Sequence, residues 1–476
     1  MFPVEELQKL RRIDSDLEGH PTPRLPFADV ATGSLGQGLG IAVGIALAGR
    51  LGKLAYNTYV LMGDGEIAEG AVWEAASLAG VNKLSNLIAI VDCNRLGQSE
   101  PTAFGHNIDI YRKRFEAFGW RVEDVDGHDI EEILEVLSGV GLNDQPLCII
   151  AKTYKGAGIS FLQDKEGWHG KPLNKEEAAR AIAELQPSSK SAAGVAIPAP
   201  SELPAPANAV PAGYPAINYK LGDLIATREA YGAALLRLGE SDERIVALDG
   251  DTKNSTYAER FFKKFPDRST ECFIAEQTLV AAAIGFGTRG KVPFASTFAA
   301  FFARAYDHIR VAGISMANLK LVGSHVGVSI GEDGPSQMAL EDFAMARGVP
   351  NCTVLYPCDA VSTFRLLAAA AVTPGPGYLR LSRPKTPVIY GPEESFPVGG
   401  SKVLRATAQD RVTVVGAGVT VFEALKAHDQ LAAEGVHIRV VDAYSIHPID
   451  RATLVDAGKA TAGPLITPER HYAAGG

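Results

Sequence analysis

Asp64 and Asn94 each follow a short apolar run that is typical of a β-strand. The runs cover residues 59–62 and 87–91, and a helical pattern of apolar positions at 69–78 separates them. Because two parallel strands joined by a helix place both following turns at the carboxyl edge of one sheet, we expect the carboxylate and the amide to lie close together. Oxygen atoms of this kind are the ligands that a hard cation such as Mg²⁺ prefers, so these residues predict a metal site.

The predicted metal ligands are Asp64, Asn94 and the backbone carbonyl of Leu96. Mg²⁺ keeps few protein ligands and takes the others from water or phosphate, so a phosphorylated ligand is expected beside it. The alternative is structural, because Gly-Asp-Gly forms tight turns and asparagine is a frequent turn residue. Taken by itself, the Gly-Asp-Gly sequence favours this structural alternative.

Three further segments carry residues suited to binding. A glycine-rich segment at 33–40 precedes a long apolar helix, and glycine lets the backbone approach a ligand while a helix N-terminus attracts phosphate. Close packing of helices explains the same pattern, so the segment alone is a weak signal. Lys155 and His169 lie in glycine-rich loops after a predicted strand at 147–151, where such residues are more often functional than on helices. His20, judged from its own surroundings, is expected to be an ordinary loop histidine.

Alternating strand and helix patterns predict an α/β protein with two parallel sheets. In the second half, strands are predicted at 244–248, 271–275, 292–296, 319–322, 352–356 and 378–381, with helices between them. A third α/β unit begins near residue 398. We therefore predict domains at 1–185, 219–395 and 396–476, with a Pro- and Ala-rich linker at 186–218.

The composition excludes several classes of protein. A length of 476 residues and a hydrophobic content of 46% are typical of a globular chain with about three domains. A net charge of −9 argues against a nucleic-acid-binding protein. Five scattered cysteines favour a reducing compartment, the first residues have no signal-peptide pattern, and the apolar stretch at 30–49 predicts a buried helix. We expect a cytoplasmic protein that binds neither nucleic acid nor membrane.

A series of segments, taken together, resembles the transketolase family, and most closely its animal members. The segments are GSLGQG, GDGE with NRLGQ, KTYKG, WHGKP, ATREAYG, DGDTKNST, IAEQ, STFAAFFARA, GSHVGVSIGEDGPSQMALED and LSRP, and they occur in the family's order. The resemblance implies two thiamine-pyrophosphate-binding parallel-sheet domains and a partial third α/β domain like the transketolase C-terminal domain. It also implies transfer of a two-carbon ketol unit from xylulose 5-phosphate to ribose 5-phosphate, a reaction of the pentose phosphate pathway.

The resemblance further implies roles for individual residues. To thiamine pyrophosphate it assigns Gly33, Ser34, Leu35, Gly65, Glu66, Asn94, Lys155, Glu276, Phe298, Phe301 and Gln337. To the sugar phosphate it assigns His20, His169, Arg228, Ser255, His325, Asp333 and Arg383. Glu276, His169 and His325 are the implied catalytic residues. The implied metal is Mg²⁺, Ca²⁺ or Mn²⁺, held by the ligands named above.

Glu276 is implied to bond N1′ of the aminopyrimidine, so that the cofactor's own amino group takes the proton of the thiazolium ring. Outside the family, a glutamate at a helix N-terminus stabilised by the helix dipole is the better interpretation. Phe298 and Phe301, expected at a helix start, are implied to pack the pyrimidine ring. Two phenylalanines at that spacing are equally typical of a hydrophobic core.

In the resembling family the active sites lie at the interface of a homodimer, so a homodimer that takes sugar phosphates is expected. The resemblance also implies that relatives carry roughly ninety residues before the point matching Met1, with two histidine motifs, and that the third domain reaches only about halfway. Two alternatives stay open. One is a non-catalytic transketolase-like protein that binds cofactor or a partner, and the other is 1-deoxyxylulose-5-phosphate synthase, which shares the cofactor and the domains.

Overall fold

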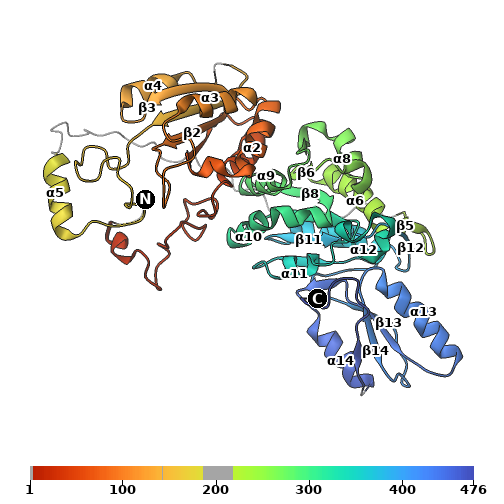
Figure 1. The fold of residues 1–476 in the computed structure, drawn as a ribbon. Coiled ribbons are helices and arrows are strands. Elements are labelled where there is room, and N and C mark those ends of the chain that lie inside the picture. The colour runs from red at the N-terminus through yellow and green to blue at the C-terminus, as the bar shows by residue number, and fades with distance from the viewer. Residues whose placement is uncertain (1–3, 142, 186–217, 462, 476) are drawn as a thin grey trace. The chain divides into compact units, whose positions relative to one another are not determined.

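The computed structural model describes residues 4–141, 143–185, 218–461 and 463–475 (Figure 1). Contacts divide the chain into two compact units, Leu35–Ala207 and Met1–Ser34 with Asn208–Gly476. The predicted linker at 186–218 lies outside the described residues except for its last position. Across the described ranges, no helix has both the length and the apolar character needed to cross a membrane.

A parallel sheet organises the unit Leu35–Ala207. Its strands are β1 (Thr58–Gly63), β2 (Leu87–Cys93), β3 (Arg121–Asp126) and β4 (Leu147–Lys152), in the order β1-β2-β4-β3. Its helices are α1 (Gly38–Leu51), α2 (Gly70–Val81), α3 (Ile108–Ala117), α4 (Ile130–Ser138) and α5 (Lys175–Leu185), with the 3₁₀ helix η2 (Glu66–Ala68). Helix α1 packs on β1 and β2, and α3 packs on β3 and β4. The labels in Figure 1 show α3 beside β3. Because helices cover it, β2 and β4 are almost continuously apolar and buried.

The crossover through α2 brings the two predicted metal-site turns to one edge of this sheet. Strands β1 and β2 pair in parallel with Gly63 opposite Asp92, and β4 ends beside β2 with Lys152 opposite Cys93. The predicted strands at 59–62, 87–91 and 147–151 are confirmed, each one or two residues longer than expected.

A larger sheet, in the order β16-β10-β11-β9-β8-β6-β7, organises the second unit. Its strands are β6 (Ile245–Asp249), β7 (Ser269–Glu271), β8 (Val292–Phe298), β9 (Lys320–Ser324), β10 (Thr353–Leu355), β11 (Gly377–Arg380) and β16 (Ser445–His447). They pair in parallel except β16, which runs antiparallel to β10. Around it lie α6 (Thr227–Ser241), α7 (Lys253–Thr256), α8 (Glu259–Lys264), α9 (Glu276–Thr288), α10 (Tyr306–Ile314), α11 (Asp342–Arg347) and α12 (Ala360–Val372). The 3₁₀ helices are η1 (Val4–Lys9), η3 (Pro266–Arg268), η4 (Ala299–Ala305), η5 (Val328–Asp333) and η6 (Pro335–Gln337).

The C-terminal part of the same unit has its own small sheet, in the order β13-β15-β14-β17. Its elements are β13 (Lys402–Arg405), β14 (Thr413–Gly416), α13 (Thr420–Ala433), β15 (Arg439–Asp442), α14 (Arg451–Thr461) and β17 (Leu465–Ile466), shown in blue in Figure 1. A short antiparallel pair, β5 (Leu224–Ala226) with β12 (Lys385–Pro387), lies elsewhere in the unit. Because β16 belongs to the larger sheet, this C-terminal part is tied directly to it.

The predicted strand at 271–275 is wrong. The structure has a strand that ends at Glu271, and Phe273 then adopts a left-handed conformation with φ of +60°. A strand cannot continue through that conformation, which is strained for a bulky residue. The turn is fixed by the Glu271 side chain, whose Oε1 accepts from the backbone N–H of Phe273 at 2.9 Å.

Candidate functional site

Asp64 is buried directly after β1, and its carboxylate is held in place. The residue is 5% exposed, and Oδ2 accepts hydrogen bonds from the backbone N–H of Arg95 and the hydroxyl of Thr102, both at 2.8 Å. Burial raises the pKa of Asp64 above its ordinary value, and the charge of Asp92 adds to the rise, although the hydrogen bonds oppose it. A divalent cation beside this carboxylate would offset the cost of burying its charge.

The turn after β2 lies against Asp64, as predicted. The backbone N–H of Asp64 donates to the carbonyl of Asp92 at 3.2 Å, which joins the two turns. In this turn Asn94 donates through Nδ2 to Oδ2 of Asp92 and accepts at Oδ1 from the N–H of Leu96, both at 3.0 Å. Because an amide oxygen has two lone pairs, Asn94 keeps the capacity to bind a cation.

The oxygen atoms available at this edge fit a hard cation. They are a carboxylate, an amide oxygen and backbone carbonyls, which are all oxygen ligands. In the part of the chain that the structure describes, no three His, Cys, Asp or Glu side chains are grouped to hold a metal ion. A cation at this edge would therefore complete its coordination with water and the oxygens of a phosphorylated ligand.

Glu66 joins the glycine-rich segment to the end of β1. Its Oε1 accepts from the N–H of Gly36 at 2.9 Å, and its Oε2 accepts from the N–H of Gly63 at 3.1 Å. Gly36 has φ of +84°, and a Cβ atom there would lie 2.6 Å from Cβ of Glu69, so the position requires glycine. Glu66 thus fixes the glycine-rich turn at the edge that carries Asp64, and Gly65 beside it is exposed.

Arg95 also holds the loop after β4, which carries Lys155 and His169. Its Nε donates to Oδ1 of Asp164 at 2.6 Å, and its Nη2 donates to the carbonyl of the same residue at 2.9 Å. Lys155 is half-buried in this loop, whereas His169 is exposed. The structure therefore ties the loop that carries Lys155 to the sheet edge that carries Asp64, but leaves His169 in solvent.

His20 and the start of the glycine-rich segment lie in the other unit. The ring of His20 packs on Gly33, where φ is +105° and a Cβ atom would lie 2.7 Å from the ring carbon Cδ2. Ser34 donates a hydrogen bond to Asp307, and Leu35, the next residue, is exposed. The contact with Gly33 gives His20 a defined position beside the predicted cofactor segment, which local sequence did not indicate.

Glu276 is the first residue of α9 and is almost completely buried. Its side chain is 3% exposed, and its Oε2 accepts from Nη1 of Arg304 at 2.6 Å. Arg304 comes from η4, the short helix that follows β8. The predicted pyrimidine-side carboxylate is therefore presented at the carboxyl edge of the larger sheet by an ion pair between α9 and η4.

Phe298 and Phe301 form the aromatic pair that the sequence predicts, with one correction. Phe298 is the last residue of β8 rather than part of a helix start, and Phe301 lies in η4. Their rings are stacked, with centroids 5.3 Å apart and planes at 13°. Both rings are partly exposed, which a core pair would not be, and a planar heterocycle could stack on them.

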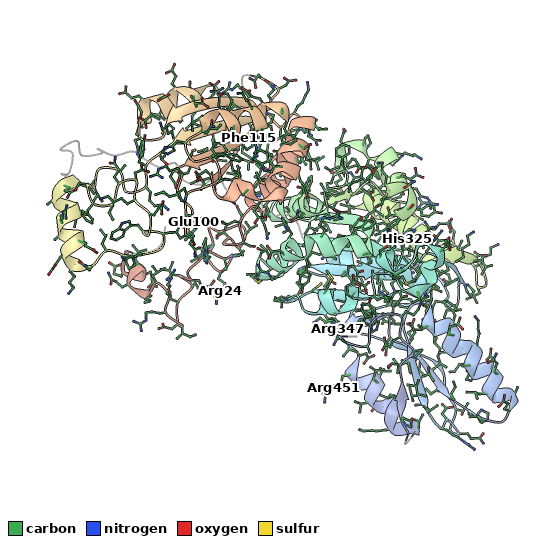
Figure 2. The ribbon with its side chains drawn as sticks, viewed as in Figure 1. Arg24, Glu100, Phe115, His325, Arg347 and Arg451 are labelled. Atoms are coloured by element: carbon green, nitrogen blue, oxygen red, sulfur yellow. The ribbon has the colours of Figure 1, made fainter. Side chains whose placement is uncertain are left out.

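Arg228, His325 and Arg383 come together from three separate elements. His325 follows β9 within the second unit (Figure 2). Its ring stacks on that of Phe298, with the two ring centroids 3.9 Å apart. Burial lowers the pKa of His325 to about 3, and the positive charges of Arg228 and Arg383 lower it further. Burial also lowers the pKa of Arg228, and the nearby Arg383 contributes. Two positively charged arginines that repel each other, beside a neutral imidazole, form a site suited to a phosphate.

Three further predicted residues differ in their contacts: Ser255 and Asp333 bind the two arginines, and Gln337 lies elsewhere. The carbonyl of Ser255 accepts from Nη1 of Arg228 at 2.6 Å, and Asp333 forms an ion pair with Arg383 at 3.4 Å. Both therefore help to orient the arginines. Gln337 ends η6, and its Oε1 is buried without a hydrogen-bond partner among the described residues, so this atom is available to a ligand.

Stability should fall on acidification because of His325. Its ring is neutral in the folded chain down to about pH 3, whereas an unfolded histidine binds a proton near its ordinary value of 6.5. Between these values the unfolded state binds more protons, so the free energy of unfolding falls as the pH falls. We expect a loss of roughly 2 kcal/mol between pH 7.5 and 5 from this residue. Urea unfolding of the wild type and His325→Gln at both pH values tests it, and an unchanged pH dependence in the variant would contradict it.

Arg304 and Arg95 were missed at the level of sequence. Arg304 follows Phe298 and Phe301 at intervals of three, which on a helix would place the three side chains on one face, so the spacing was a usable signal. Arg95 stands inside NRLGQ, but its contact with Asp164 joins residues 69 positions apart. No local pattern indicates such a pair.

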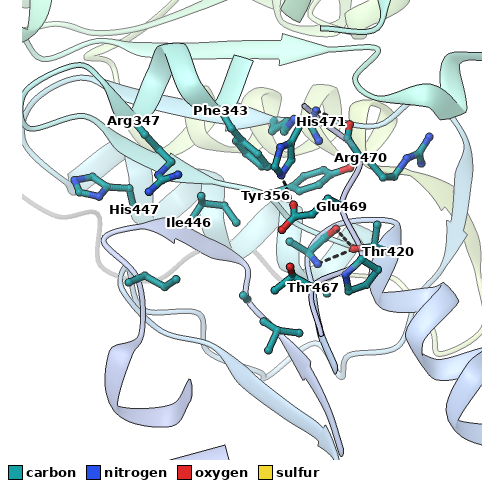
Figure 3. A pocket seen from close by; sticks show the side chains of 17 residues that line it. Phe343, Arg347, Tyr356, Thr420, Ile446, His447, Thr467, Glu469, Arg470 and His471 are labelled. Carbon is teal, nitrogen blue, oxygen red and sulfur yellow. Dashed lines mark hydrogen bonds and ion pairs between the residues drawn. The ribbon is translucent and has the colours of Figure 1, made fainter. Parts of the chain in front are cut away.

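A cavity of about 260 Å³ lies apart from these residues in the second unit (Figure 3). It is lined by Phe343, Arg347, Tyr356, Arg380, Val415, Gly416, Ala417, Thr420, Ala443, Ile446, His447, Ile449, Thr467, Pro468, Glu469, Arg470 and His471. Glu469 pairs with His471, which raises the pKa of that histidine. The residues predicted to bind cofactor or substrate are not among those lining it, so this cavity is not the predicted site.

Comparison with known proteins identifies the domains. The transketolase thiamine diphosphate binding domain matches residues 1–195, the transketolase pyrimidine binding domain matches 223–388, and the transketolase C-terminal domain matches 401–476. Transketolase of Rattus norvegicus is 52% identical over 478 residues, covering 100% of this chain and 76% of the relative. Transketolase of Homo sapiens is 52% identical over 474 residues, covering 99% of this chain and 76% of the relative.

Solved structures agree with the sequence relatives. Transketolase from Campylobacter jejuni superposes with a TM-score of 0.86 at 26% identity, over 99% of this chain and 80% of that one. A Pichia stipitis transketolase variant has a TM-score of 0.87 at 24% identity, over 100% of this chain and 80% of that one, which shows the shared fold. The chain thus spans about three quarters of the curated relatives' length. It is a member of the transketolase family, the thiamine-pyrophosphate enzymes that move a two-carbon ketol unit between sugar phosphates.

Proposed function

We propose that this transketolase uses xylulose 5-phosphate as donor and ribose 5-phosphate as acceptor, and that the residues described above form its site. The observation that carries the proposal is the stack of His325 on Phe298. It joins an aromatic pair suited to the cofactor's pyrimidine to two arginines suited to a sugar phosphate. Cofactor and substrate positions are thereby adjacent at one edge of the larger sheet.

The cofactor is held through its two ends. Asp64, Asn94 and the carbonyl of Leu96 would hold Mg²⁺, or Ca²⁺ or Mn²⁺, against the pyrophosphate, with Gly33, Ser34, Leu35, Gly65, Glu66 and Lys155 around it. Glu276 would bond N1′ of the pyrimidine, Phe298 and Phe301 would stack on its ring, and Gln337 would offer its buried Oε1. Bound thiamine pyrophosphate supplies a carbon nucleophile for the donor's carbonyl group.

The substrate residues position the sugar and move its protons. Arg228 and Arg383 would bind the phosphate through their planar guanidinium groups, with Ser255 and Asp333 orienting them. His325, neutral near pH 7, can donate or accept a hydrogen bond at a sugar hydroxyl, and His169 and His20 would contact the hydroxyls nearer the reacting carbon. His169 is exposed, so its loop would close on the sugar when it binds.

Assembly, domain limits and location complete the proposal. We infer a cytoplasmic homodimer in which each active site lies at the subunit interface. The pyrophosphate-binding domain covers 1–185, the pyrimidine-binding domain 219–395 and the C-terminal domain 396–476, joined through 186–218. These limits can be tested by limited proteolysis, which should cut first between residues 186 and 218.

Turnover of xylulose 5-phosphate with ribose 5-phosphate is the direct test of the function. The wild-type chain should form product only with thiamine pyrophosphate and a divalent cation present, and Glu276→Gln should lower kcat about 10²–10⁴-fold because it removes the carboxyl group that would bond N1′. An exposed acid in the same unit, Glu434, provides the matched control Glu434→Gln. Cofactor binding without turnover would instead support the non-catalytic alternative, and formation of deoxyxylulose phosphate would support the synthase.

A further inference from the structure

The ion pair of Glu276 with Arg304 has no place in the roles assigned so far. Glu276 is 3% exposed in its side chain, whereas the Arg304 side chain is 57% exposed and reaches inward from η4 to bring Nη1 within 2.6 Å of Oε2. A long, solvated side chain is thus ordered on a buried carboxylate. The two residues stand 28 positions apart, and the pair connects the first residue of α9 with η4, which packs on that helix.

Burying an ionised carboxylate is costly unless it has partners, and the helix N-terminus supplies only part of what is needed. Arg304 supplies the rest as a charge-assisted hydrogen bond. Because it uses Oε2, the other carboxylate oxygen remains for a second partner. Arg304 also follows Phe301 by three residues on η4, so the contact that fixes the carboxylate fixes the helix that carries this ring.

We propose that Arg304 is a positioning residue for the cofactor: it holds Glu276 by Oε2 so that Oε1 faces the aminopyrimidine. The inference rests on the proposed function, which places N1′ at Glu276. Through the same contact Arg304 keeps the stacked pair of Phe298 and Phe301 in register with the carboxylate. The carboxylate and the two stacked rings then contact the pyrimidine as one rigid surface. Few side chains therefore lose conformational freedom when the cofactor binds.

The test is the dissociation constant of thiamine pyrophosphate in saturating Mg²⁺, followed by calorimetry on the full chain. Arg304→Met keeps the stem but removes the charge and should weaken binding about tenfold, the value of one hydrogen bond to a charged group. Arg304→Lys keeps a donor and should recover most of the loss. The matched control is Arg237→Met, which breaks an exposed pair with Glu240 and should change binding less than twofold.

A double-substitution cycle separates positioning from general support of the fold. If Arg304 acts through the carboxylate, Arg304→Met should add less than twofold to the weakening already caused by Glu276→Gln. Arg304→Met should lower the melting temperature, because it leaves the buried carboxylate of Glu276 without its ion pair, but it should lower it little further in the Glu276→Gln background, where no charge is left unpaired. Equal losses from Arg304→Met in both backgrounds, or no rescue by lysine, would overturn the proposal.

The outcomes also distinguish this inference from the proposed function. If Glu276→Gln weakens cofactor binding and Arg304→Met does not, the role of Arg304 is wrong and the function stands. If Glu276→Gln binds cofactor as the wild type does, the placement of N1′ at Glu276 is wrong, and the inference falls with it.

Discussion

Asp64→Asn is expected to remove the dependence of thiamine pyrophosphate binding on Mg²⁺ together with most of the binding. The substitution keeps an oxygen that can accept from the N–H of Arg95 and the hydroxyl of Thr102, so the turn should stay folded. It removes the negative charge that a cation needs between the protein and a pyrophosphate. Without the cation, the negative charges of the pyrophosphate would face Asp92 and the remaining oxygen ligands with no positive charge between them. Calorimetric titration of cofactor with Mg²⁺ and with a chelator measures both effects.

The affinity loss should reach two orders of magnitude or more, since a charged metal ligand is removed rather than a single neutral hydrogen bond. Asp144→Asn is a matched control in the same unit, because Asp144 is exposed and pairs with Lys83 at the surface. Equal cofactor affinity for the wild type with Mg²⁺ and with chelator would show that Asp64 and Asn94 hold no metal.

The sheet edge that carries Asp64 and Asn94 could be predicted because the sequence patterns that indicate it are local. A strand buried on both faces needs a continuous apolar run, and the run before Asn94 is of this kind. The run before Asp64 is equally apolar, although Tyr59 and Leu61 of that strand are exposed. A right-handed crossover through α2 then leaves little choice about which edge both turns share. The raised pKa of Asp64 and the bracing of Gly36 by Glu66 depend on packing that only the folded chain provides.

The pyrimidine side was harder to predict because its contacts join distant residues. Glu276 and Phe298 could be named from family segments, yet the strand expected before Glu276 ends early, at Glu271. A turn follows it, in which Phe273 is left-handed and is bonded by the Glu271 side chain. The gathering of His325 with two arginines requires three elements separated by about 150 positions (383 − 228 = 155). Periodicity describes one element at a time, and therefore cannot show which charged side chains meet.

Mixing Asp64→Asn chains with Glu276→Gln chains should restore cofactor binding and turnover that neither has alone. In the proposed homodimer, each site takes its metal ligand from one subunit and its pyrimidine-side carboxylate from the other. After random exchange half of the dimers are mixed, and each mixed dimer carries one intact site and one doubly substituted site. About a quarter of all sites should then be active, which is far above the residual level of either parent.

The matched control mixes wild type with a chain that carries both substitutions. If sites are shared, the mixed dimers have no intact site, and active sites should fall from half to about a quarter as subunits exchange. If each site lies within one chain, the first mixture should stay inactive and this control should stay at half. Shared sites therefore predict a change in both mixtures, whereas sites within one chain predict no change in either, and differently tagged chains show that exchange has taken place. Activity followed against the fraction of mixed dimers decides whether Asp64 and Glu276 serve one active site from two subunits.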